Sequence, residues 1–134
     1  MSIVTIIIGR KGDMPRIEPL HKVLDDYKIE YSTKILSAHR NLDELIAFLK
    51  TDQSKVIIAA AGLSAALPGV VAAQTTVPVI GIPLDVGALQ GIDALLSILQ
   101  LPKGIPCATM GVGKQGVINA GHFAKRILDL LQAE

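Results

Sequence analysis

The stretch I-V-T-I-I-I-G, residues 3–9, is a short β-branched run that ends at a glycine, and it decides the fold class. A run of this length and composition is typical of a buried strand. A second run, V-I-I-A-A-A at residues 56–61, is apolar at every position. Strands with one solvated face alternate apolar and polar residues, whereas strands covered on both faces do not. The two runs therefore predict a parallel sheet covered on both faces.

Helical patterns lie between the apolar runs. Apolar side chains in residues 14–27 recur three and four positions apart, which is the spacing of one helix face. Asp13 is the expected N-cap of this helix, Pro15 suits its first turn, and Asn41 is the expected N-cap of the next helix. Further strands are expected at 29–36, 77–82 and 105–110, and further helices at 63–73, 92–101 and 117–132.

Strands and helices alternate five times, which predicts a three-layer α/β/α sandwich of the flavodoxin-like or Rossmann-like type around five parallel strands. The 134 residues fit one domain, 1–134. The chain is 50% hydrophobic and 19% charged, too apolar for a disordered protein. A net charge of +1 and 3% aromatic residues argue against nucleic acid as a partner.

Targeting and redox signals are weak. Neither a signal peptide nor an apolar run of membrane-spanning length stands out, so we expect a cytoplasmic protein without a membrane partner. The single cysteine, Cys107, excludes an internal disulfide framework and is expected to be a small buried core residue. The high apolar fraction of so small a domain favours oligomerisation.

Ligands of parallel α/β sheets bind outside the carboxyl ends of the strands. Five polar or glycine-rich loops are expected to meet at that edge of the sheet. They are residues 9–13, 37–40, 61–64, 83–85 and 111–114.

The loop G-R-K-G-D, residues 9–13, opens a helix. Backbone N–H groups there favour an anion, and Arg10 and Lys11 add positive charge. The loop has neither the Walker A spacing nor the dinucleotide fingerprint. Two interpretations stay open: a phosphate site, or a solvated turn that Asp13 caps. Asp13 could instead accept hydrogen bonds from ribose hydroxyls.

The segment S-A-H-R, residues 37–40, joins a strand end to a helix start. His39 is the one histidine at a strand's carboxyl end, and Arg40 beside it can form a fork onto phosphate. His21 is expected to be solvated within a helix, and His122 to lie at a packing surface. No histidine, cysteine or carboxylate pair has metal-ligand spacing, so we expect no metal site.

The segment A-A-A-G-L-S-A-A, residues 59–66, consists of small residues except for Leu63. Small residues allow close approach either by a ligand or by a packed helix, and both interpretations stay open. Ser64 lacks the surrounding G-x-S-x-G elbow, so it is not a candidate nucleophile.

Five segments together resemble the class I PurE family of purine biosynthesis. They are S-A-H-R at 37–40, A-G-L-S-A-A-L-P-G at 61–69, T-T-V-P-V-I-G-I-P at 75–83, the segment 91–106 from G-I-D-A to K-G-I-P, and N-A-G at 119–121. The resemblance covers nearly the whole chain in order. It implies a flavodoxin-like domain in a homo-octamer that uses no metal and no other cofactor. The implied activity is that of an N5-carboxyaminoimidazole ribonucleotide mutase or an aminoimidazole ribonucleotide carboxylase acting with CO2.

The resemblance also implies roles for particular residues. His39 matches the family's catalytic histidine, Ser37 and Arg40 match its phosphate ligands, and Asp13 matches the residue that holds the ribose hydroxyls. The remaining expected substrate-binding residues are Gly9, Arg10 and Gly12 of the phosphate loop, Ala38, and the pocket-lining residues Ala61, Gly62 and Leu63.

The chain departs from the family pattern at three positions. Arg10 and Gly12 replace the two serines of the usual G-S-x-S-D, and Ala66 replaces the histidine of the usual A-H-L-P-G. These departures leave two alternatives open. One is a divergent paralogue that acts on another nucleotide, and the other is a non-catalytic nucleotide-binding module.

Overall fold

Five parallel strands form one sheet in the computed structural model, which describes residues 2–132. The strands are β1 (Val4–Ile8), β2 (Tyr31–Ile35), β3 (Val56–Ala61), β4 (Val79–Pro83) and β5 (Ala108–Thr109). Their order across the sheet is β2-β1-β3-β4-β5, with every neighbouring pair parallel. This is the flavodoxin-like order, in which the chain reverses direction across the sheet next to β1.

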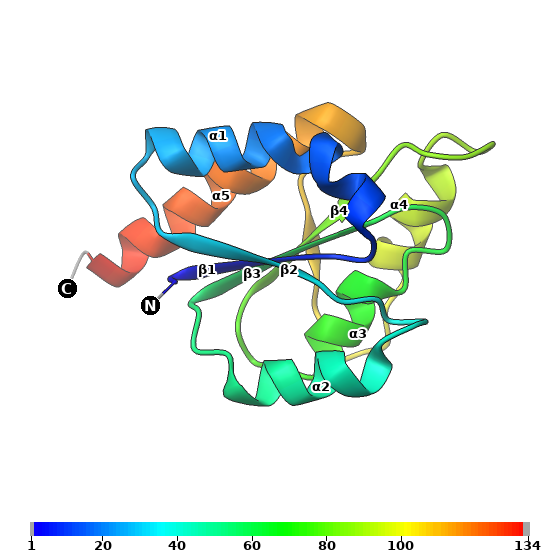
Figure 1. Cartoon of the computed structure of the whole chain (residues 1–134), viewed down its shortest axis with the longest axis horizontal. Helices are drawn as coiled ribbons and strands as arrows, with labels where there is room; N and C mark the ends of the chain where they lie inside the picture. The colour runs from blue at the N-terminus through cyan, green and yellow to red at the C-terminus, as the bar shows by residue number, and fades with distance from the viewer. Residues whose placement is uncertain (1, 133–134) are drawn as a thin grey trace.

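Helices cover both faces of the sheet (Figure 1). Helices α1 (Glu18–Asp26) and α5 (Gly113–Gln132) lie on one face, and α2 (Leu42–Thr51) and α3 (Leu67–Ala73) lie on the other. Helix α4 (Ile92–Leu99) packs near β4 and β5. The predicted three-layer sandwich with five parallel strands is therefore confirmed.

Successive strand residues face opposite layers, which explains the continuous apolar runs. In β1, Ile6 and Ile8 pack in the cluster with α1 and α5, whereas Ile7 packs in the cluster with α2 and α3. A glycine in α5 lets the first layer close tightly. A Cβ atom at Gly121 would lie 2.8 Å from Cγ1 of Val23 in α1, so the two helices meet at a distance that only glycine permits.

The expected N-cap role of Asp13 is wrong. Residues Lys11–Ile17 form a 3-10 helix, η1, and Asp13 lies inside it as a buried residue. The α-helix begins only at Glu18, with Pro19 in its first turn. Because proline has no N–H to donate and is disruptive inside a helix, Pro19 disfavours one continuous α-helix from residue 14, whereas Pro15 would fit its first turn. The carboxylate of Asp13 is therefore not committed to a helix end.

Other boundaries also differ from those predicted. Helix α3 begins at Leu67 rather than residue 63, α5 begins at Gly113 rather than residue 117, and β5 is only two residues long. Asn41 holds the N-cap position of α2 but makes no side-chain capping bond. Instead, its Oδ1 atom accepts a hydrogen bond of 3.2 Å from the backbone N–H of Ser37.

Cys107 is half-buried rather than a core residue, and burial raises the pKa of its thiol to about 11. Within residues 2–132, no helix combines the length and the apolar character needed to cross a membrane.

Candidate active site

A cavity of ≈ 280 Å³ lies at the carboxyl ends of β1, β2 and β3. It forms where the strand order reverses, the usual position of a ligand site in this architecture. Every substrate-binding or catalytic residue expected from the sequence borders this cavity, except Gly12. The lining consists of Gly9, Arg10, Asp13, Ser37, Ala38, His39, Arg40, Ala61, Gly62, Leu63, Ser64, Ala66, Leu67 and Val86.

Ser37 organises the turn that carries His39. Its Oγ atom accepts hydrogen bonds of 3.2 Å from the backbone N–H groups of both His39 and Arg40. The backbone N–H of Asn41 donates to the Ser37 carbonyl at 2.9 Å and closes the same turn. Because both side-chain bonds use the Ser37 oxygen as acceptor, its hydroxyl proton stays available to donate to a ligand. The turn thus presents a hydroxyl donor, an imidazole and a guanidinium group at the cavity.

Arg10 and Asp13, which follow β1, form an ion pair that also borders the cavity. The Nε atom of Arg10 donates to Oδ1 of Asp13 at 3.1 Å, and the Arg10 side chain is 56% exposed while that of Asp13 is 5% exposed. A buried carboxylate with a charged donor is held in one orientation. Arg10, Arg40 and Asp13 give the cavity lining two cations and one anion, a balance that favours an anionic ligand.

The two glycines of the first loop play different parts. A Cβ atom at Gly9 would meet nothing within 4 Å, so its backbone is open to the cavity. A Cβ atom at Gly12 would lie 3.8 Å from the Arg10 guanidinium group, which places Gly12 against that side chain. Gly9 therefore leaves space for a ligand, whereas a Cβ atom at Gly12 would make only an ordinary van der Waals contact with Arg10.

Apolar residues from the loops after β3 and β4 form the facing wall. Gly62 and Leu63 follow β3, and Val86 follows β4. A Cβ atom at Gly62 would lie 2.2 Å from Cγ2 of Val86, so Gly62 is required by the fold rather than by a ligand. Leu67 and Val86 are lining residues that sequence reasoning missed. No local pattern shows that the loop after β4 folds back over Gly62.

The loop 111–114 does not join this cavity. Gly113 and Lys114 lie instead at a separate depression, together with Asp85 and Arg16. Of the five loops expected to meet, those after β1, β2 and β3 build the cavity. None of residues 83–85 lines it, and the segment after β4 contributes only the next residue, Val86.

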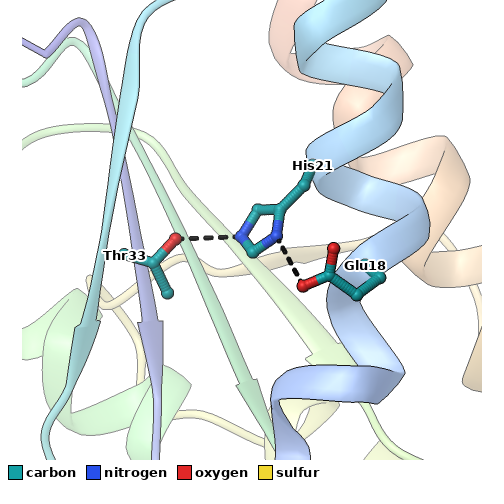
Figure 2. Close-up of polar contacts among 3 residues, drawn as sticks. All are labelled: Glu18, His21 and Thr33. Atoms are coloured by element: carbon teal, nitrogen blue, oxygen red, sulfur yellow. Dashed lines mark hydrogen bonds and ion pairs between the residues drawn. The ribbon is translucent and has the colours of Figure 1, made fainter.

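His21 is not solvated, contrary to the sequence expectation. Figure 2 shows its ring between Glu18 and Thr33, with Nδ1 3.1 Å from Glu18 Oε1 and Nε2 3.0 Å from Thr33 Oγ1. The ring also stacks on Tyr31, with centroids 5.1 Å apart. These contacts tie α1 to the edge strand β2, away from the cavity. Nδ1 of His122 in α5 lies 2.7 Å from the hydroxyl of Tyr27, the C-cap residue of α1, and His122 itself is exposed.

Among residues 2–132, no three histidine, cysteine, aspartate or glutamate side chains are grouped as metal ligands would be.

Comparisons with known proteins agree with one another. The family model described as AIR carboxylase matches residues 3–134. The chain is 45% identical over 129 residues to the N5-carboxyaminoimidazole ribonucleotide mutase of Bacillus subtilis, covering 94% of this chain and 80% of that protein. It is 42% identical over 133 residues to the phosphoribosylaminoimidazole carboxylase of Schizosaccharomyces pombe, covering 97% of this chain but 24% of that protein.

The fold comparison points to the same group. The crystal structure of Treponema denticola PurE superposes with a TM-score of 0.86 at 31% identity, covering 97% of this chain and 82% of that chain. A match along nearly the whole chain, on the same fold, identifies the family without reliance on one motif. The chain belongs to the AIR carboxylase family, the PurE group that its motifs resemble.

Proposed function

We propose that the chain is an N5-carboxyaminoimidazole ribonucleotide mutase of purine biosynthesis. The observation that carries the proposal is the cavity at the β1–β3 edge, which gathers the residues expected from the sequence on one polar wall. Relatives named as this mutase, such as that of Bacillus subtilis, support the same assignment.

The polar wall supplies ligands for a nucleoside monophosphate. Ser37 and Arg40 bind the phosphate through a hydroxyl donor and a guanidinium group, and Arg10 adds a second positive charge. Asp13 accepts hydrogen bonds from the ribose hydroxyls with the oxygen that Arg10 does not engage. The aminoimidazole ring then lies toward Ala61, Gly62 and Leu63.

His39 is the proposed acid–base group. The N–C bond of the carbamate breaks, its electron pair returns to the nitrogen, and His39 supplies the proton that this nitrogen takes up. The ring carbon then forms a bond to the freed CO2 and loses its proton to the same imidazole. One histidine serves both steps because proton uptake and release balance over the reaction. The electron-rich aminoimidazole ring is itself the nucleophile.

A direct carboxylation of aminoimidazole ribonucleotide by CO2 uses the second half of the same sequence. The similarity to the relative named phosphoribosylaminoimidazole carboxylase is the reason to consider this second reaction. The two activities differ in whether the carboxyl group arrives on the substrate nitrogen or as free CO2.

A divergent paralogue is the second candidate, and Ala66 is the observation that favours it. Ala66 lines the cavity where the family pattern has a histidine. Loss of that imidazole changes the polarity of the pocket beside the apolar wall. A non-catalytic nucleotide-binding module is the third candidate, and His39 at the cavity argues against it.

Assembly and location complete the proposal. We propose a cytoplasmic homo-octamer without a cofactor, in which α4 contributes to subunit contacts. Ile92, Leu96 and Leu99 of α4 are each more than half exposed and fall on one helix face, so this chain has apolar surface to bury.

The test offers the purified chain N5-carboxyaminoimidazole ribonucleotide, and in a separate reaction aminoimidazole ribonucleotide with CO2. We expect the chain to form the carboxylated ring product from the first substrate, at a rate that saturates as the substrate concentration rises. Product in the second reaction but not in the first identifies the carboxylase. Tight binding of aminoimidazole ribonucleotide without product from either reaction identifies the binding module.

A further inference from the structure

Leu63 adopts a backbone conformation that L residues avoid. Its φ angle is 57°, in the left-handed region, and it is one of three non-glycine residues with positive φ within residues 2–132. A branched side chain in this region costs free energy, so the surrounding structure must hold it there. Strain of this kind in a site-lining residue calls for a physical account.

The contact that holds Leu63 comes from the loop after β4. A Cβ atom at Gly87 would lie 2.6 Å from Cδ2 of Leu63, so the leucine side chain rests on the bare backbone of that glycine. One position earlier in each loop, Val86 rests on Gly62 in the same way. The two loops thus interlock through two side chains and two glycines.

The interlock places Leu63 at the rim of the cavity. Leu63 lines the cavity and is 56% exposed, so it lies between the interior and solvent. Val86 lies beside it, and the charged wall of Arg10, Asp13 and Arg40 comes from the other two loops. Leu63 therefore forms part of the apolar lining at the rim of the cavity, as Val86 does.

We infer that Leu63 is a retention residue, whose side chain decides whether freed CO2 is recaptured by the imidazole ring or escapes. This inference rests on the proposed function and names the residue that governs its fidelity. Between cleavage of the N–C bond and formation of the C–C bond, CO2 is held by no covalent bond. Loss at that stage leaves aminoimidazole ribonucleotide, with the proton on its nitrogen, and free CO2.

Leu63→Gly separates this role from a structural one. Glycine relieves the positive φ angle, so the variant should unfold at the same temperature as the wild type or higher. Without the side chain, the ratio of released aminoimidazole ribonucleotide to carboxylated product should rise about tenfold, the lower range for one apolar group in a pocket. Carbamates also lose CO2 unaided, so the rate without enzyme is subtracted.

Two further variants test whether the effect comes from the Leu63 side chain and is specific to the cavity. Leu63→Ala keeps a Cβ atom at a positive φ angle but removes the rest of the side chain. It should therefore raise the ratio of released aminoimidazole ribonucleotide to carboxylated product as Leu63→Gly does, without the gain in stability. Leu89→Ala is the matched control, because Leu89 is 58% exposed on the loop after β4 and does not line the cavity. Its ratio should equal that of the wild type.

The outcomes are distinct. A wild-type chain that turns over, with variants at position 63 whose product ratio is unchanged, overturns the inference and leaves the proposed function standing. Equal leakage in Leu89→Ala also overturns it, because the effect would not be specific to the cavity rim. A wild-type chain that forms no carboxylated product overturns the proposed function, and the inference with it.

Discussion

The guanidinium Nε of Arg10 lies 3.1 Å from Oδ1 of Asp13, and the arginine is mostly exposed while the carboxylate is buried. An exposed ion pair contributes little to stability. Here the pair instead fixes the orientation of a carboxylate at the cavity wall, and it leaves part of the guanidinium group open toward a ligand. We therefore expect Arg10 to act on the substrate directly, through its charge, and indirectly, through Asp13.

Arg10→Ser should weaken nucleotide binding by about 1–3 kcal/mol, because a charge-assisted donor is lost and Asp13 loses its partner. Titration calorimetry with aminoimidazole ribonucleotide measures the change. Lys11→Ser is the control, because Lys11 is an exposed cation of the same turn that does not line the cavity. Equal affinities for Arg10→Ser and the wild type would show that neither the charge of Arg10 nor its pairing with Asp13 contributes to nucleotide binding.

Alanine substitutions at Gly9 and Gly62 should distinguish a glycine that leaves room for a ligand from one that is needed for packing between loops. Gly9→Ala puts its methyl group into the open cavity, so it should leave stability nearly unchanged and raise KM. Gly62→Ala puts its methyl group 2.2 Å from Cγ2 of Val86, so it should lower the unfolding free energy by about 1–3 kcal/mol. Thermal denaturation and steady-state kinetics give both readings. A loss of stability in Gly9→Ala, or a raised KM with unchanged stability in Gly62→Ala, would contradict these assignments of the two glycines.

The sequence was informative wherever the deciding interactions are local. Apolar runs predicted the strands, and the position of S-A-H-R after a strand predicted that His39 faces the ligand edge. The errors share a different cause. His21 appeared solvated because its partner Thr33 comes from another element, and Val86 was missed because its contact with Gly62 joins two loops. Contacts between elements leave no periodic signal along the chain.

Thr33→Val should lower the unfolding free energy by about 1 kcal/mol, because it keeps the side-chain shape and removes the hydroxyl that pairs with His21 Nε2. Turnover should not change, since this contact ties α1 to β2 and lies outside the cavity. Denaturant unfolding and kcat are measured on the same preparation. A parallel fall in kcat would assign the Glu18–His21–Thr33 group a part in catalysis.

The chain should run as an octamer in solution at micromolar concentration. Leu96→Asp should give smaller species, because it places a charge in the exposed apolar face of α4. Lys22→Asp, on the exposed side of α1, is the control and should leave the mass unchanged. Light scattering gives the mass, and a monomeric wild type would end the assembly proposal.

His39→Asn should keep the fold and the affinity for nucleotide, because asparagine is similar in size and the turn is held by backbone bonds to Ser37. Turnover should fall by about 100-fold or more, the usual contribution of a general acid–base group. A variant with raised KM and unchanged kcat would assign His39 to binding instead. If kcat stays near the wild-type value, the proton must move through water or the substrate itself, and Ser37 and Arg40 would only position the nucleotide.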